Sequence, residues 1–229
     1  MNLMDRITLF APLDMAAVGL LLFFWQAMGW WVERPSARRP SVSIIMAGYR
    51  REWMRQMITR EPRIFDAQTI GTLRQGTSFF ASTCVIALGG LLALIGNADQ
   101  VAGVARDLTQ TSTPVVVWEI KLLLVVGFLT NSFLKFAWAN RLFGYCSVVV
   151  AAVPNDPSNP KAEGIATKAA ELNIAAARSF NRGLRSVYFA LASIAWLAGP
   201  LPLISAALLT TVVIWRREFA SRSRRILLD

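Results

Sequence analysis

Residues 76–96 read GTSFFASTCVIALGGLLALIG and contain no charged side chain. A helix of about 20 predominantly apolar residues is long enough to cross the ~30 Å hydrocarbon core of a bilayer. The composition of the whole chain agrees with this, because 55% of its 229 residues are hydrophobic and 17% are charged. An ordinary soluble domain has about 25% charged residues. The stretch therefore predicts a transmembrane helix in an all-α membrane protein.

Four further apolar runs flank this segment, at residues 12–31, 114–135, 183–199 and 201–215. The first ends in two tryptophans and is longer than the apolar part of a signal peptide, so we expect a retained span. The run from 114 continues without a helix breaker to residue 153, which predicts one helix that extends beyond the membrane. The last two runs are separated by Gly199-Pro200-Leu201-Pro202. Proline removes a helical hydrogen bond, so either a hairpin of two short spans or one kinked span results.

Arginine is distributed unevenly along the chain, which has a formal net charge of +10. Most of it falls in residues 32–75, 154–182 and 216–229. Cytoplasmic segments of membrane proteins are rich in Arg and Lys. We therefore predict that these three segments are cytoplasmic and that residues 97–113 form an external loop. Five crossings then place the N-terminus outside and the C-terminus inside a cell inner (plasma) membrane, with residues 1–229 as one membrane domain. Four crossings are the alternative.

One cytoplasmic segment has the periodicity of an amphipathic helix. Met46, Tyr49, Trp53 and Met57 recur at intervals of three and four residues, whereas the arginines between them fall elsewhere. Such a helix lies flat at a lipid interface or packs on neighbouring helices. The predicted fold class is therefore an all-α, polytopic transmembrane helical bundle with an amphipathic cytoplasmic helix.

Residue types needed for several kinds of chemistry are missing. The chain has no histidine, which excludes Ser/His and Cys/His catalysis and His-ligated metals. Cys84 and Cys146 each lie in an apolar run, and we interpret them as small buried hydrophobes. We expect no enzyme activity, no catalytic residues, no metal and no cofactor. The basic residues lie beside apolar runs rather than among base-reading elements, so we expect no nucleic-acid partner.

Three ionisable residues fall within predicted spans near their outer ends: Asp14, Glu119 and Lys121. Ionisable groups in hydrocarbon cost roughly 2.5 to 3.5 kcal/mol on insertion scales and usually face the interior of a bundle. A pair of Lys121 with Asp14 or with Glu119 would line a polar path for an ion or substrate. The alternative is a structural pair near the interface, with Lys121 extending outward to the head groups.

A second set of charges lies at the cytoplasmic boundary. Lys135, Trp138 and Arg141 recur every three residues, and Arg182 and Arg185 follow in a later segment. These cations would bind lipid phosphate or another anion. The alternative is ordinary anchoring by positive charge on the inner side of the membrane.

Several strings of residues resemble a known family. They are Tyr49-Arg50, Trp53-Met54, Arg60-Glu61, Phe79 to Thr83, Phe133 to Trp138 with Arg141, Tyr145 to Ser147, Arg178 to Arg185, Tyr188 to Ala192 and Arg216 to Phe219. Together they are similar to the membrane family called domain of unknown function 599, found in bacteria and plants. The resemblance covers most of the chain. It implies a multi-spanning membrane protein and brings no activity, ligand or catalytic residue with it.

Two functions remain open from the sequence. The first is an oligomeric channel or transport-type protein, expected as a homo-oligomer because so few spans rarely enclose a pathway alone. The second is a non-catalytic membrane scaffold or accessory subunit that binds lipid or a protein partner. Both have the lipid bilayer and its anionic head groups as partners.

Overall fold

A computed structural model describes residues 9–36, 38–97, 103 and 114–228. Within these residues the regular structure is helical, and the predicted all-α class is confirmed. The main helices are α2 (Pro12–Glu33), α3 (Val42–Met57), α4 (Ile64–Gly96), α6 (Val115–Ala151), α7 (Ala162–Ile194) and α8 (Pro200–Phe219). A 3-10 turn, η1 (Ala195–Ala198), joins α7 to α8, and the short helix α9 (Arg222–Leu228) follows. Of the predicted external loop, residues 98–102 and 104–113 lie outside the described part.

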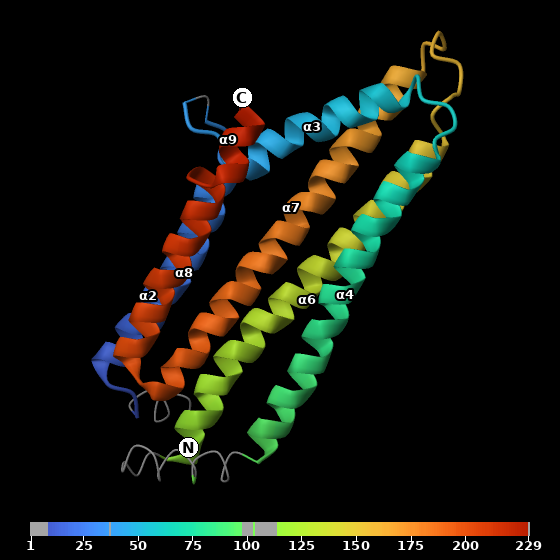
Figure 1. Cartoon of the computed structure of the whole chain (residues 1–229). Helices are drawn as coiled ribbons and strands as arrows, with labels where there is room; N and C mark the ends of the chain where they lie inside the picture. Colours follow the sequence, from blue (N-terminus) through green and yellow to red (C-terminus); the bar gives the residue numbers. More distant parts are fainter. Residues whose placement is uncertain (1–8, 37, 98–102, 104–113, 229) are drawn as a thin grey trace.

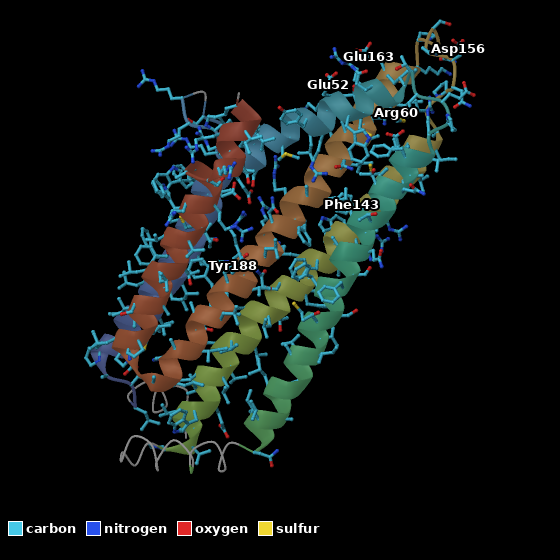
Figure 2. All side chains as sticks on the ribbon, viewed as in Figure 1. Glu52, Arg60, Phe143, Asp156, Glu163 and Tyr188 are labelled. Atoms are coloured by element: carbon cyan, nitrogen blue, oxygen red, sulfur yellow. The ribbon has the colours of Figure 1, made fainter. Side chains whose placement is uncertain are left out.

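The long helices run alternately up and down the molecule (Figure 1). The helix α7 packs on α6, and α6 packs on α4 on its other side. The helices α2 and α8 lie side by side against α7, and α3 crosses the bundle at an angle, over the N-terminal half of α7. The end of the bundle that carries α3, α9 and the α6–α7 turn is called the α3 end below. It carries many charged side chains, including the labelled Glu52, Arg60, Asp156 and Glu163 (Figure 2).

Three of the described helices, α2, α4 and α6, are long and apolar enough to cross a membrane. In α4, only 6% of the most apolar stretch of 18 residues is buried inside the bundle. Large apolar side chains such as Phe79, Ile86 and Leu92 therefore point outward, exposed by 65%, 76% and 56%. A bundle with this surface is a membrane-embedded protein, because a soluble domain would not present such an apolar face to water.

Besides a small cluster between α6 and α7, two larger apolar cores lie at different heights along α7. One joins α2, α6, α7 and α8 around Leu21, Phe189 and Leu203. The other lies at the α3 end and joins α3, α4, α6 and α7 around Met54, Met57 and Cys146. Both cysteines are buried, as the sequence predicted. The middle of α7 between these cores is polar, and this is the region that contains the candidate site.

The chain reverses at Gly199, whose φ of 120° favours glycine. Pro200 follows at the first position of α8, where its missing N–H costs nothing. Before this turn, α7 runs unbroken from Ala162 to Ile194. A single helix therefore joins the predicted cytoplasmic segment 154–182 to the predicted span 183–199, and its polar middle is directly continuous with its apolar C-terminal half.

The helix α3 begins at Ser41, whose hydroxyl accepts a hydrogen bond from Ile44 N at 3.2 Å and donates one to Val32 O at 2.7 Å. It packs on α7. Not every residue of the predicted apolar stripe points toward α7, since Tyr49 is 51% exposed. Arg50, which lies off that stripe in the sequence pattern, contacts α7 through Asn173.

Candidate functional site

An ion cluster joins the end of α2 to the middle of α7. Arg182 Nε donates to Glu33 Oε1 at 2.8 Å, and Arg185 Nη2 pairs with the same carboxylate. The Arg185 side chain is only 7% exposed, whereas that of Arg182 is 47% exposed. One carboxylate therefore neutralises a buried guanidinium and holds a second, more exposed one beside it. Two hollows meet at this cluster, because Glu33 and Arg185 line both of them.

The first hollow is a groove of about 780 Å³ between α2, α6 and α7. Four cations line it: Arg34 just after α2, Lys135 from α6, and Arg182 and Arg185 from α7. Trp30 lines it as well, and its ring lies 4.9 Å from the Arg34 guanidinium carbon. A groove that combines indole rings with cations suits a ligand that has both an anionic and an apolar part.

Hydrogen bonds fix the base of this groove. Ser186 Oγ accepts from Trp25 Nε1 at 3.2 Å and from Asn131 Nδ2 at 2.6 Å. The Trp25 ring in turn packs edge-on against Phe128, with ring centroids 5.4 Å apart. Helices α2, α6 and α7 are thereby tied together at the bottom of the groove, so its shape is set by the packing of the bundle.

The structure brings together some of the cations predicted at the cytoplasmic boundary but not all of them. Lys135, Arg182 and Arg185 all line the groove, but Arg141 does not. Arg141 is exposed and donates to the Tyr145 hydroxyl on its own helix. The reason is geometric: each helical residue turns the side chain by about 100°, so residues six apart differ by about 120°. The three-residue repeat that suggested a single stripe therefore drifts around α6.

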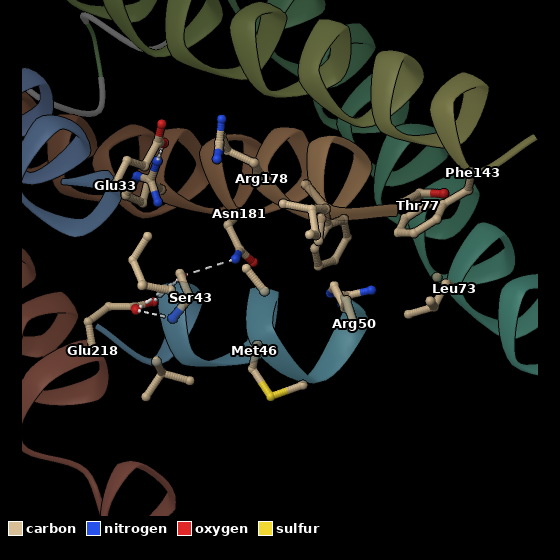
Figure 3. Close-up of a pocket in the computed structure, with 18 of the residues that line it drawn as sticks. Glu33, Ser43, Met46, Arg50, Leu73, Thr77, Phe143, Arg178, Asn181 and Glu218 are labelled. Atoms are coloured by element: carbon tan, nitrogen blue, oxygen red, sulfur yellow. Dashed lines mark hydrogen bonds and ion pairs between the residues drawn. The ribbon is translucent and has the colours of Figure 1, made fainter. Parts of the chain in front are cut away.

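The second hollow is a cavity of about 400 Å³ beneath α3. Its wall combines apolar side chains such as Met46, Leu73 and Phe143 with polar ones (Figure 3). At one end Ser43 links three helices, since Asn181 Nδ2 donates to Ser43 Oγ at 3.3 Å and Ser43 N donates to Glu218 Oε2 at 3.1 Å. These bonds hold α3 against α7 and α8.

Arg50 lines the same cavity from α3. Its Nη1 donates to Asn173 Oδ1 of α7, and Asn173 is fully buried. The Asn173 amide also donates to Cys146 Sγ at 3.7 Å. Burial lowers the pKa of Arg50, and the adjacent Cys146 partly offsets this shift. Arginine is not deprotonated in proteins, so Arg50 remains a cation in this position.

Two of the three predicted outer charges, Asp14 and Lys121, meet around one indole rather than in an ion pair. Trp196 Nε1 donates to Asp14 Oδ1 at 2.7 Å, and Lys121 Nζ lies 5.7 Å from the centre of the Trp196 ring. Lys121 is 8% exposed and also lies 5.2 Å from the Trp118 ring. Within the described residues, no salt bridge joins Lys121 to Asp14 or to Glu119, and Glu119 is partly buried on α6.

Comparison with known proteins identifies a family. The profile of the family described as "Protein of unknown function, DUF599" matches residues 16–223. The chain belongs to this family. No curated protein and no solved structure matches the chain. The family match spans the groove and the cavity in full, and of the sequence-predicted site residues only Asp14 lies outside it.

Sequence reasoning missed several residues of the site. One of them is Glu33, which lines both hollows and pairs with Arg185. It follows the aromatic end of the first apolar run. The sequence signal that could have identified it is an acidic residue directly before a basic segment. Asn173 and Asn181 gave no such signal, because single amides in an Ala-rich helix have no characteristic spacing. Their roles depend on where α3 lies.

Proposed function

We propose that this protein is a non-catalytic membrane protein that binds anionic lipid head groups at the cytoplasmic face of a cell inner membrane. The observation that carries the proposal is the groove in which Arg34, Lys135 and Arg182 surround an opening lined by Trp25 and Trp30. Guanidinium and ammonium groups bind phosphate, and tryptophan is enriched where head groups meet acyl chains. A phospholipid presents both kinds of group together.

The orientation of the bundle supports the same proposal. Two Arg-rich segments, α3 and the end of α8 with α9, lie toward the same end of the bundle in Figure 1, together with the turn between α6 and α7. We propose that α2, α4, α6, α7 and α8 all cross the membrane, which brings these segments to one side; of the five, α2, α4 and α6 are long and apolar enough to span. The positive-inside bias then makes the α3 end cytoplasmic and the N-terminus external. The groove lies toward this end, at the level of an inner-leaflet head group.

Removing two groove cations tests this function. Arg34→Gln combined with Lys135→Gln leaves the Glu33 ion cluster intact and should weaken phosphatidylglycerol binding at least about tenfold, since each basic residue near an anionic surface contributes about 1 kcal/mol. Native mass spectrometry of protein from mixed phosphatidylglycerol and phosphatidylcholine measures how much of each lipid is retained. Arg141→Gln is the matched control because Arg141 is an exposed cation away from the groove. Equal losses in the control and the double variant would contradict a groove site.

A transport function is the second candidate, and one observation favours it. Lys121 is buried on a predicted membrane-crossing helix beside the indole that binds Asp14. Cations in this position often mark ion or substrate paths. In this function the protein acts as a homo-oligomer. Lys121→Gln should then reduce anion flux in proteoliposomes at unchanged protein yield, and an absence of flux in both forms would exclude this function.

A further inference from the structure

The cavity beneath α3 contains a cation that no carboxylate neutralises. Across residues 9–36, 38–97, 103 and 114–228, no acidic side chain forms an ion pair with Arg50. The two acids that line the cavity are held elsewhere: Glu33 binds Arg182 and Arg185, and Glu218 accepts hydrogen bonds from Ser43. Arg50 is partly buried, and charges withdrawn from water in proteins are usually paired, so its lack of a carboxylate partner requires an explanation.

The neighbours of Arg50 leave most of its hydrogen-bonding capacity available. A guanidinium has five N–H donors, and the Asn173 amide oxygen accepts from one of its two terminal nitrogens. The amide is neutral, so it orients the guanidinium without cancelling its charge. Figure 3 shows Arg50 rising from α3 with Leu73, Thr77 and Phe143 on the facing helices. Arg50 therefore faces a wall of mixed character, in which Leu73 and Phe143 are apolar and the exposed Arg178 of α7 is a further cation.

Helices α3, α4, α6 and α7 form most of this wall, and the ends of α2 and α8 complete it. Cavity residues recur at Ser43, Met46, Ala47 and Arg50 on α3, which is one helical face. Helix α7 contributes a face that includes Ile174, and α4 and α6 close the far side. The cavity volume of about 400 Å³ falls within the range of small-molecule pockets, roughly 300 to 1,000 Å³.

We propose that this cavity is a binding site for an organic anion that carries one carboxylate or phosphate and an apolar portion, with Arg50 as the anion-binding residue. The anion completes the charge balance of Arg50, and the apolar portion packs on Leu73 and Phe143. The site is distinct from the groove and does not depend on the function proposed for it.

Calorimetric titration of the full-length protein in phosphatidylcholine nanodiscs with phenyl phosphate tests the proposal. Phenyl phosphate should bind at least about tenfold more tightly than inorganic phosphate, which lacks the ring, and than benzyl alcohol, which lacks the charge. Arg50→Gln should weaken phenyl phosphate by about tenfold or more, because a hydrogen bond to a charged group is lost. Arg51→Gln is the control, because Arg51 is the next residue but pairs with Glu171 outside the cavity. Equal affinities of the two variants, or equal affinities of the three probes, would overturn the proposal.

A second variant keeps the test valid if Arg50→Gln does not fold. Gly76 lines the cavity, and a Cβ added there meets no heavy atom within 4 Å. Gly76→Leu should therefore fill part of the cavity and weaken phenyl phosphate with Arg50 intact. Unchanged affinity in Gly76→Leu would place the anion elsewhere and refute the site. The groove variant Arg34→Gln/Lys135→Gln should bind phenyl phosphate as the wild type does.

Lipid composition distinguishes the two sources of such an anion. If phosphatidylglycerol in the nanodisc lowers the apparent affinity for phenyl phosphate, and Arg50→Gln removes this competition, the site takes a lipid head group. If phosphatidylglycerol has no effect, the site takes a water-soluble anion. A competition that persists in Arg50→Gln would assign phenyl phosphate binding to another surface and contradict the proposal.

Discussion

Glu33→Gln is expected to lower the free energy of unfolding by about 3 kcal/mol or more, because it leaves a buried guanidinium without its counter-charge. Arg185 is 7% exposed, and its carboxylate partner in the described bundle is Glu33. The amide of glutamine preserves shape and hydrogen-bonding capacity but supplies no charge. Chemical denaturation in mixed detergent micelles, followed by far-ultraviolet circular dichroism, measures the change.

The matched control is Glu171→Gln at the pair with Arg51. In that pair the nitrogen-to-oxygen distance is 2.7 Å, but both side chains are more than half exposed. Exposed pairs contribute about 0 to 1 kcal/mol, so this variant should unfold close to the wild type. Similar destabilisation by the two substitutions would show that the burial of Arg185 does not determine the loss of unfolding free energy in Glu33→Gln.

Gly183→Ala is expected to destabilise the α6–α7 interface by about 1 to 3 kcal/mol, the usual cost of overpacking. A Cβ at Gly183 would lie 2.7 Å from Phe136 Cε1 and 2.9 Å from Phe136 Cδ1. The Phe136 ring is fully buried and lies against the rings of Phe80 and Phe180, so it has little room to move. The thermal midpoint in detergent measures the effect.

Gly164→Ala on the same helix provides the control. An added Cβ at Gly164 meets nothing within 4 Å. Alanine is a better helix former than glycine by roughly 1 kcal/mol, so this variant should match or exceed the wild-type midpoint. A rise in the midpoint for Gly183→Ala as well would mean that the two helices are more loosely packed than the structure shows.

The two predictions concern residues two positions apart on α7, namely Gly183 itself and Arg185, the partner of Glu33. Gly183 permits the close approach of α7 to α6, and Arg185 closes the ion cluster with α2. Both lie in the string Arg178 to Arg185, which the sequence analysis noted for its family resemblance. In the structure this string separates the groove from the cavity, since members of it line both.

Most of the helices could be predicted from the sequence because their determinants are local. Residues 76–96 form the second half of α4, and the uninterrupted run from 114 to 153 forms α6. The Gly199-Pro200 pair marks the reversal between α7 and α8. In each case the information lies within a few turns of helix, as the absence of a breaker or as a residue suited to a turn.

The candidate site could be predicted only in part. The structure brings the predicted candidates Lys135, Arg182 and Arg185 to one groove. Arg141 lies away from it, because a three-residue repeat does not keep to one face of an α-helix. The contact of Arg50 with α7 was not predicted, since apolar periodicity shows which side of a helix is apolar but not which neighbour lies there.

By itself the sequence determined that this is an all-helical membrane protein, which segments are apolar helices and where arginine is concentrated. Hydrophobicity and helix-breaking residues act over short stretches of chain, so they can be read locally. Only the tertiary structure decided which charges meet, because Glu33 and Arg182 are 149 residues apart in sequence. Such contacts depend on the angle and rotation at which helices pack, and neither property is contained in one helix alone. The groove, the cavity and the position of Arg50 all depend on that packing.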